Sequence, residues 1–99
     1  MASQEKQQLA TEIKNHIEKE GSGYKNWYVG ITNDIDKRLF GDHCVSKQSW
    51  WIHREARNSA EAREIEEYFF GKGCQGDTGG GDNSTKYVYA YKISSATRE

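Results

Sequence analysis

The sequence predicts a small α+β domain in which helices flank a mainly antiparallel sheet of three strands. Three observations support this fold class: helical and strand-like hydrophobic periods alternate along the chain, aromatic residues supply much of the apolar area, and the chain has only 99 residues. The expected order is helix, strand, helix, strand, helix, strand. No internal repeat or interdomain linker interrupts this order, so we expect residues 1–99 to form a single domain.

The first expected element is a helix over residues 3–20. Leu9, Ile13 and Ile17 recur every four residues, which places them on one stripe of a helix. Glutamine, glutamate and lysine fill most of the remaining positions, so the opposite face is polar. A glycine at position 21 ends the pattern.

A strand is expected next, because residues 26–32 are β-branched and aromatic with a period of two. The alternation gives two faces: Trp27, Val29 and Ile31 on one, and Tyr28, Gly30 and Thr32 on the other. Asn33 or Thr32 is expected to cap a short helix that runs to about Phe40. In that helix we expect three inward side chains: Ile35, Leu39 and Phe40.

The second half of the chain repeats this alternation. Residues 50–56 predict a strand, and Asn58 with Glu61 resembles a capping box that opens a helix from about 59 to 70. The glycine-rich residues 71–84 predict a loop. The last strand spans residues 86–93, the core thus runs from 26 to 93, and residues 94–99 form a tail. Core positions expected on the helix are Ala62, Ile65 and Phe69.

Composition excludes several classes of protein. Apolar residues make up 34% and aromatic residues 12% of the chain, the mean hydropathy is -1.01 and the net charge is -1. No apolar run approaches the roughly 18 residues of a membrane span. The balanced charge disfavours a basic nucleic-acid coat protein. Two cysteines without metal-ligand spacing favour reduced thiols, so we expect a cytoplasmic protein with no membrane contact.

Residues 28–39 (YVGITNDIDKRL) carry the most informative pattern. Gly30 leaves the backbone open to close approach by a phosphate, and Tyr28 projects a phenol from the same face. The strand-to-helix turn returns Arg38 over this face, where a guanidinium can clamp two phosphate oxygens. The stretch resembles the second signature of the GIY-YIG nuclease superfamily, in which an arginine follows the tyrosine by ten residues. Taken alone, Tyr28 and Arg38 would also suit a packed tyrosine and a surface arginine.

The resemblance implies metal-dependent hydrolysis of a nucleic-acid phosphodiester, with DNA favoured over RNA. Tyr28 would position or activate water, Arg38 would bind phosphate, and Glu66 in the AREIE segment 62–66 would hold one Mg²⁺ or Mn²⁺ ion. His43 is a further catalytic candidate, although it follows the arginine by five residues where the family often has four. The candidates for contact with nucleic acid are Gly30, Lys37 and Asn83.

One departure from the family pattern is the missing first signature. A Gly-Ile-Tyr strand is expected about a dozen residues before Tyr28, but counting back reaches His16 inside the predicted helix. Two explanations are open. The domain is inactive, or the last strand pairs beside Tyr28 in a permuted sheet and Tyr89 replaces the missing tyrosine.

Other interpretations of the same residues lead to different functions. An inactive module on this scaffold would bind nucleic acid or protein without cleaving it, and the small size favours a homodimer or a protein partner. The tyrosines at 87, 89 and 91 predict either a base-stacking platform or a sheet face packed on the first helix. Trp50 and Trp51 point to opposite faces of a strand, so one of them is a candidate interface anchor.

Overall fold

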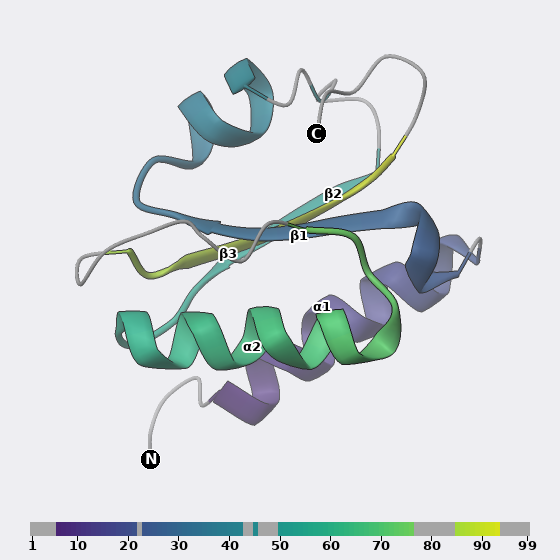
Figure 1. Ribbon diagram of the computed structural model, residues 1–99, viewed down its shortest axis with the longest axis horizontal. Helices are drawn as coiled ribbons and strands as arrows, with labels where there is room; N and C mark the ends of the chain where they lie inside the picture. The colour runs from purple at the N-terminus through teal and green to yellow at the C-terminus, as the bar shows by residue number, and fades with distance from the viewer. Residues whose placement is uncertain (1–5, 22, 43–44, 46–49, 77–84, 94–99) are drawn as a thin grey trace.

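Three antiparallel strands form the sheet of a small α+β fold, which confirms the predicted fold class (Figure 1). The structure, a computed structural model, describes residues 6–21, 23–42, 45, 50–76 and 85–93, without the side chains of Lys6, Arg38 and Asp42. The strands are β1 (Trp27–Thr32), β2 (Trp51–Glu55) and β3 (Tyr87–Lys92). Their order in space is β1-β3-β2, so the last strand lies in the centre of the sheet.

Helices lie on both sides of this sheet (Figure 1). The helices α1 (Lys6–Glu20) and α2 (Ser59–Lys72) cover one face, with α2 over β1 and α1 against α2 and β2. The short helix η2 (Asp36–Asp42) lies over the other face, and a single 3₁₀ turn, η1 (Tyr24–Asn26), precedes β1. In the described part of the chain, no helix is long and apolar enough to cross a membrane.

The main core lies between the sheet and the two long helices. Leu9, Ile13 and Ile17 of α1 are at most 2% exposed, which confirms the predicted stripe. They pack with residues of β1 that share one face, among which Trp27 and Val29 are fully buried. Period-two alternation therefore assigned the two faces of β1 correctly.

The helix α2 begins and ends where its sequence provides caps. The backbone N–H of Glu61 donates to the side-chain oxygen of Asn58 at 2.9 Å, as the predicted capping box requires. Gly73 ends the helix in a left-handed conformation with φ 111°, two residues later than expected, and its N–H donates to the carbonyl of Phe70. The expected core residues Ala62, Ile65 and Phe69 are buried.

The helix η2 differs from the prediction in its start and its winding. It begins at Asp36 with π-helical winding, whereas a helix from about residue 33 was expected. Asp34 provides the cap, because its side-chain oxygen accepts from the N–H of Lys37 at 3.2 Å. Thr32 instead closes a turn by accepting from the N–H of Asp34. Asn33, an expected cap, is exposed, and the aspartate one position later takes its place.

The chain after α2 returns to the sheet, which the glycine-rich sequence did not predict. Gln75 lies parallel to β1 at its outer edge. Its N–H donates to the carbonyl of Trp27 at 2.8 Å, and its own carbonyl accepts from the N–H of Val29 at 2.9 Å. These two bonds satisfy part of the otherwise open edge of β1.

Candidate functional site

The sheet face opposite the long helices carries most of the buried tyrosines, and we call it the tyrosine face. It is formed by Tyr28 and Gly30 of β1, Tyr89 and Tyr91 of β3, and Trp51 and His53 of β2. The ring of Tyr28 stacks with that of Tyr91 at a centroid distance of 5.2 Å and with that of Tyr89 at 6.4 Å. The predicted pairing of the last strand beside Tyr28 is therefore present.

Gly30 and Tyr89 fit together as a pair at the centre of this face. The two residues are partners in the antiparallel register of β1 and β3. A Cβ atom built on Gly30 would lie 2.6 Å from Cζ of Tyr89 and would overlap its hydroxyl oxygen. The missing side chain of the glycine thus makes the space in which the phenol of Tyr89 lies.

The helix η2 covers the tyrosine face with apolar side chains. Leu39 is fully buried and Val45 is 4% exposed, and both pack in one cluster with Tyr28, Tyr89 and Tyr91. Ile35 and Phe40 are partly buried against the same cluster, as expected for inward residues of this helix. Arg38 belongs to η2, so its backbone lies over the tyrosine face, while its side chain is outside the described part. Lys37 is exposed.

A polar pocket of about 350 Å³ lies where β1 turns into η2. It is lined by Asn33, Asp34, Ile35, Asp36, His53 and Tyr87. Burial is the main reason that the pKa of His53 lies below its usual value, and the charge of Arg54 acts in the same direction, while Asp36 opposes it. A neutral imidazole is therefore the form that this pocket favours. No sequence motif identified His53 as a site residue, although the period of two places it on the same face as Trp51.

Glu66 lies on α2, the helix over the opposite face of the sheet. Glu66 is only 4% exposed, whereas Glu64 and Glu67 are exposed. A buried carboxylate requires charged or hydrogen-bonding neighbours, and Glu66 does have interactions of this kind. Glu66 thus differs from Glu64 and Glu67 in its burial.

The neighbours of Phe70 indicate which side of α2 carries Glu66. Phe70 follows Glu66 by one helical turn on the same side of α2. The ring of Phe70 lies against Gly76, and Gly76 lies beside the carbonyl of Val29. Glu66 therefore lies on the same side of α2 as Phe70, and α2 packs on β1 from the face opposite the tyrosines.

Among the residues that the structure describes, no three His, Cys, Asp or Glu side chains gather into a metal site. The family resemblance implies only one protein carboxylate, Glu66, and Mg²⁺ in proteins commonly uses one or two carboxylates and keeps several waters. Glu66 is 4% exposed and already has interactions within the chain.

Two predicted site residues, His43 and Asn83, lie outside the described residues. The prediction of a base-stacking platform is wrong, because Tyr89 and Tyr91 are at most 1% exposed. The alternative of packing on the first helix is wrong as well, since these tyrosines face η2 and not α1. The alternation of β3 was correctly identified, but it does not determine which helix covers which face.

Comparisons with known proteins found no relative of this chain. No family model matches its sequence, and no curated protein or solved structure is significantly similar to it.

Proposed function

We propose that this protein is a metal-dependent nuclease that hydrolyses a nucleic-acid phosphodiester bond on its tyrosine face, with DNA as the favoured substrate. The observation that carries the proposal is the pairing of β3 with β1, which brings Tyr89 against Gly30 and beside Tyr28. This is the arrangement that a permuted GIY-YIG-like sheet requires, with the last strand in the place of the missing first signature.

Arg38 and the tyrosines of this face suit part of the chemistry of the reaction. Arg38, carried by η2 over the tyrosine face, would hold two oxygens of the scissile phosphate. Tyr28 or Tyr89 would orient the attacking water through its phenol. A phenol has an ordinary pKa near 10, so it acts as a base at neutral pH only if a nearby cation lowers that value. Glu66 lies on α2 on the opposite side of the sheet, so an Mg²⁺ or Mn²⁺ ion bound through it would have to reach the phosphate around the edge of β1 to neutralise its charge and stabilise the leaving oxygen.

The test is an incubation with single- and double-stranded DNA and RNA, with Mn²⁺ or with a chelator. We expect cleavage that needs the metal and that falls by about 10²–10⁴-fold in Arg38→Ala, Glu66→Gln and Tyr89→Phe, in line with the loss of a single catalytic group. Persistent cleavage in Arg38→Ala and Glu66→Gln would overturn the proposal.

Matched controls are available on the same elements. Glu67→Gln removes the exposed carboxylate next to Glu66 and should leave the rate unchanged. Tyr91→Phe removes a phenol that is as buried as that of Tyr89 but stands opposite Tyr28 instead of Gly30. A loss of activity in Tyr91→Phe as large as in Tyr89→Phe would contradict the assignment of Tyr89.

The second candidate is a binding module on the same scaffold without catalysis. Burial favours it, because Tyr28 and Tyr89 are only 4% and 1% exposed beneath η2. The net charge of -1 also provides no general attraction for a polyanion. Retained binding of labelled nucleic acid without cleavage at any metal concentration would select this function, and the salt dependence of that binding would count the phosphate contacts.

A further inference from the structure

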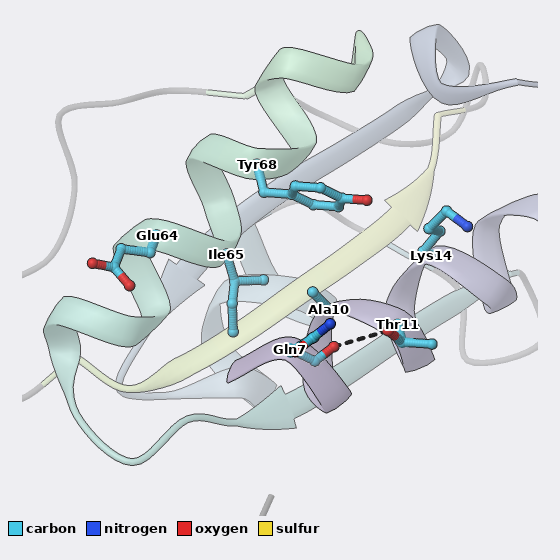
Figure 2. A pocket seen from close by; sticks show the side chains of 7 residues that line it. All are labelled: Gln7, Ala10, Thr11, Lys14, Glu64, Ile65 and Tyr68. Carbon is cyan, nitrogen blue, oxygen red and sulfur yellow. Dashed lines mark hydrogen bonds between the residues drawn. The ribbon is translucent and has the colours of Figure 1, made fainter. Parts of the chain in front are cut away.

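The hollows of the protein surface differ in whether the chain itself already uses their polar groups. In the groove between α1 and α2, the hydroxyl of Thr11 donates to the carbonyl of Gln7 at 2.9 Å (Figure 2), and Lys14 pairs with Glu18 at 3.5 Å. Glu64, on the α2 side of this groove, has an interaction of its own. The chain therefore leaves little of the polarity of this groove for a ligand.

The polar pocket at the turn from β1 into η2 is different. Four side chains that line it form no hydrogen bond with another residue in the described part of the chain: Asn33, Asp36, His53 and Tyr87. Its volume of about 350 Å³ lies within the range of small-ligand sites. Donors and acceptors that converge on one hollow without using each other are available to a ligand that supplies the complementary groups.

His53 gives this pocket a flat aromatic wall. Its ring stacks on that of Trp51 with an interplanar angle of 3° and a centroid distance of 5.7 Å. Trp51, His53 and Glu55 follow one another on one face of β2, and Tyr87 is the register partner of Glu55. One face of the imidazole therefore meets Trp51, and the other is directed to the side of the pocket where Tyr87 lies. Such a wall accepts a planar heterocycle by stacking.

The charge of the pocket selects the kind of group that can bind there. Asp34 and Asp36 provide two carboxylates, and His53 favours its neutral form, because burial and then the charge of Arg54 lower its pKa while Asp36 opposes them. A phosphate is repelled by this set, whereas N–H donors are attracted. One oxygen of Asp34 already accepts from the N–H of Lys37, but the carboxylate of Asp36 forms no hydrogen bond with the described residues.

We infer that the polar pocket binds one unpaired guanine base of the substrate, stacked on His53 and held by the carboxylate of Asp36. Guanine presents N1–H and its 2-amino group side by side, and these two donors match the two oxygens of a carboxylate. Thymine and uracil present one N–H between two carbonyl oxygens, which a carboxylate repels. Adenine and cytosine present an acceptor nitrogen beside the amino group, so each offers a single donor on this edge.

The choice of a nucleobase rests on the proposed function, and the position of the pocket agrees with it. His53 is the register partner of Tyr89, so the pocket adjoins the face on which the phosphodiester is proposed to be cleaved. Because guanine is read on the edge that pairs with cytosine, the pocket requires a single-stranded or unpaired guanine next to the scissile phosphate.

The test is a titration of the metal-free protein with 2′-deoxyguanosine, with 2′-deoxyinosine, which lacks the 2-amino group, and with thymidine. The backbone amides of β2 and η2 report binding by NMR. We expect deoxyguanosine to bind at least about tenfold more tightly than deoxyinosine, which is typical for one hydrogen bond to a charged group, and thymidine to bind more weakly still. Equal affinities for deoxyguanosine and thymidine, or no binding of deoxyguanosine at millimolar concentrations, would overturn the inference.

Two substitutions separate recognition of the base edge from stacking. Asp36→Asn places an amide NH₂ group opposite one donor of the base, so it should abolish the preference for deoxyguanosine over deoxyinosine. His53→Ala removes the flat wall and should weaken both nucleosides alike, by about tenfold or more. Glu67→Gln, the same change of carboxylate to amide on the exposed side of α2, is the matched control and should alter neither affinity. A preference that persists in Asp36→Asn would contradict the assignment of Asp36.

These measurements need neither metal nor catalysis, so they are separate from the cleavage assays. A protein that cleaves DNA but binds no deoxyguanosine would overturn the guanine pocket alone. A protein that binds deoxyguanosine with the expected preference but never cleaves DNA would support the pocket and overturn the nuclease. Circular dichroism checks that each variant is folded.

Discussion

The two faces of the sheet differ in the kind of side chain that they bury. The face under α1 and α2 is aliphatic apart from Trp27 and belongs to the larger core. The tyrosine face buries three phenols beneath a short π-wound helix. A buried phenol oxygen needs a hydrogen-bond partner, which an aliphatic side chain of similar size does not. The comparison indicates that the face under α1 and α2 stabilises the fold by apolar burial, whereas the tyrosine face also buries phenol oxygens that require hydrogen-bond partners.

The largest expected effect on stability comes from the sheet face under α1 and α2. Trp27 is fully buried, and its indole N–H donates to Glu20 at 3.2 Å. Trp27→Ala should lower the free energy of unfolding by about 3–5 kcal/mol, as typical for a large side chain removed from a core. Urea denaturation measures this loss. A smaller loss than that of Tyr89→Ala on the tyrosine face would contradict the comparison.

Gly30→Ala tests how tightly the tyrosine face is packed. The new methyl group would overlap the phenol of Tyr89, a buried side chain that would have to shift. We expect a loss of about 1–3 kcal/mol in the free energy of unfolding, a typical cost of overpacking. Gly71→Ala on α2 is the matched control, because its methyl group meets no described atom within 4 Å and alanine favours a helix. Equal destabilisation by both would show that Gly30 makes no special space.

Each face also has a helix with its own cap. Asn58 caps α2 on one side of the sheet, and Asp34 caps η2 on the side of the tyrosine face. Removing either cap with alanine should cost about 1 kcal/mol locally. Since α2 supports the main core and η2 only covers the tyrosine face, Asn58→Ala should lower the global unfolding midpoint, while Asp34→Ala should speed hydrogen exchange in η2. Global destabilisation by both would contradict this division.

The smallest expected effect is on the pH dependence of stability, through one histidine on each side of the sheet. His16 of α1 lies against Trp27 and Trp50, and its buried Nε2 has no hydrogen-bond partner among the described residues. Burial, and then the charge of Arg54, lowers the pKa of His16 below 6.5. Burial lowers the pKa of His53 in the same direction. The folded state therefore favours the neutral form of both histidines. Their contribution to the free energy of unfolding is complete above about pH 6.5 and is lost as the pH falls through their lower pKa values in the folded state.

The measurement is the unfolding midpoint as a function of pH for the wild type, His16→Phe and His53→Phe. Each variant should lose part of the destabilisation that the wild type shows below about pH 6.5. Asp36→Asn should lower the pKa of His53 further, because the opposing carboxylate is removed. Titration of the ring protons by NMR would contradict this account if either histidine titrated above its unfolded value.

Much of the fold was predictable because its signals are local. Periods of four and of two identified α1 and β1 with their buried faces, and Asn58 with Glu61 marked the start of α2. The winding of η2 and the return of Gln75 to β1 were not predictable. Both depend on contacts between distant segments, such as the two hydrogen bonds of Gln75 with β1, for which the sequence has no local signal.

The candidate site was also predictable only in part from the sequence. The sequence identified Tyr28, Gly30 and the buried carboxylate Glu66 from a motif and a helical position. It did not indicate that His53 reaches the polar pocket, because that position depends on β2 lying beside β3 and near Asp36. The register of a sheet sets such neighbours, and register is a property of paired strands.

The sequence by itself determined which side chains of each strand share a face, since alternation is a property of a single extended chain. Only the tertiary structure decided which strand lies beside β1 and which tyrosine stands opposite Gly30. Three tyrosines of β3 share one face, and their spacing is identical. The pairing of β3 in the centre of the sheet selects Tyr89, because its phenol fits the space that the glycine leaves open.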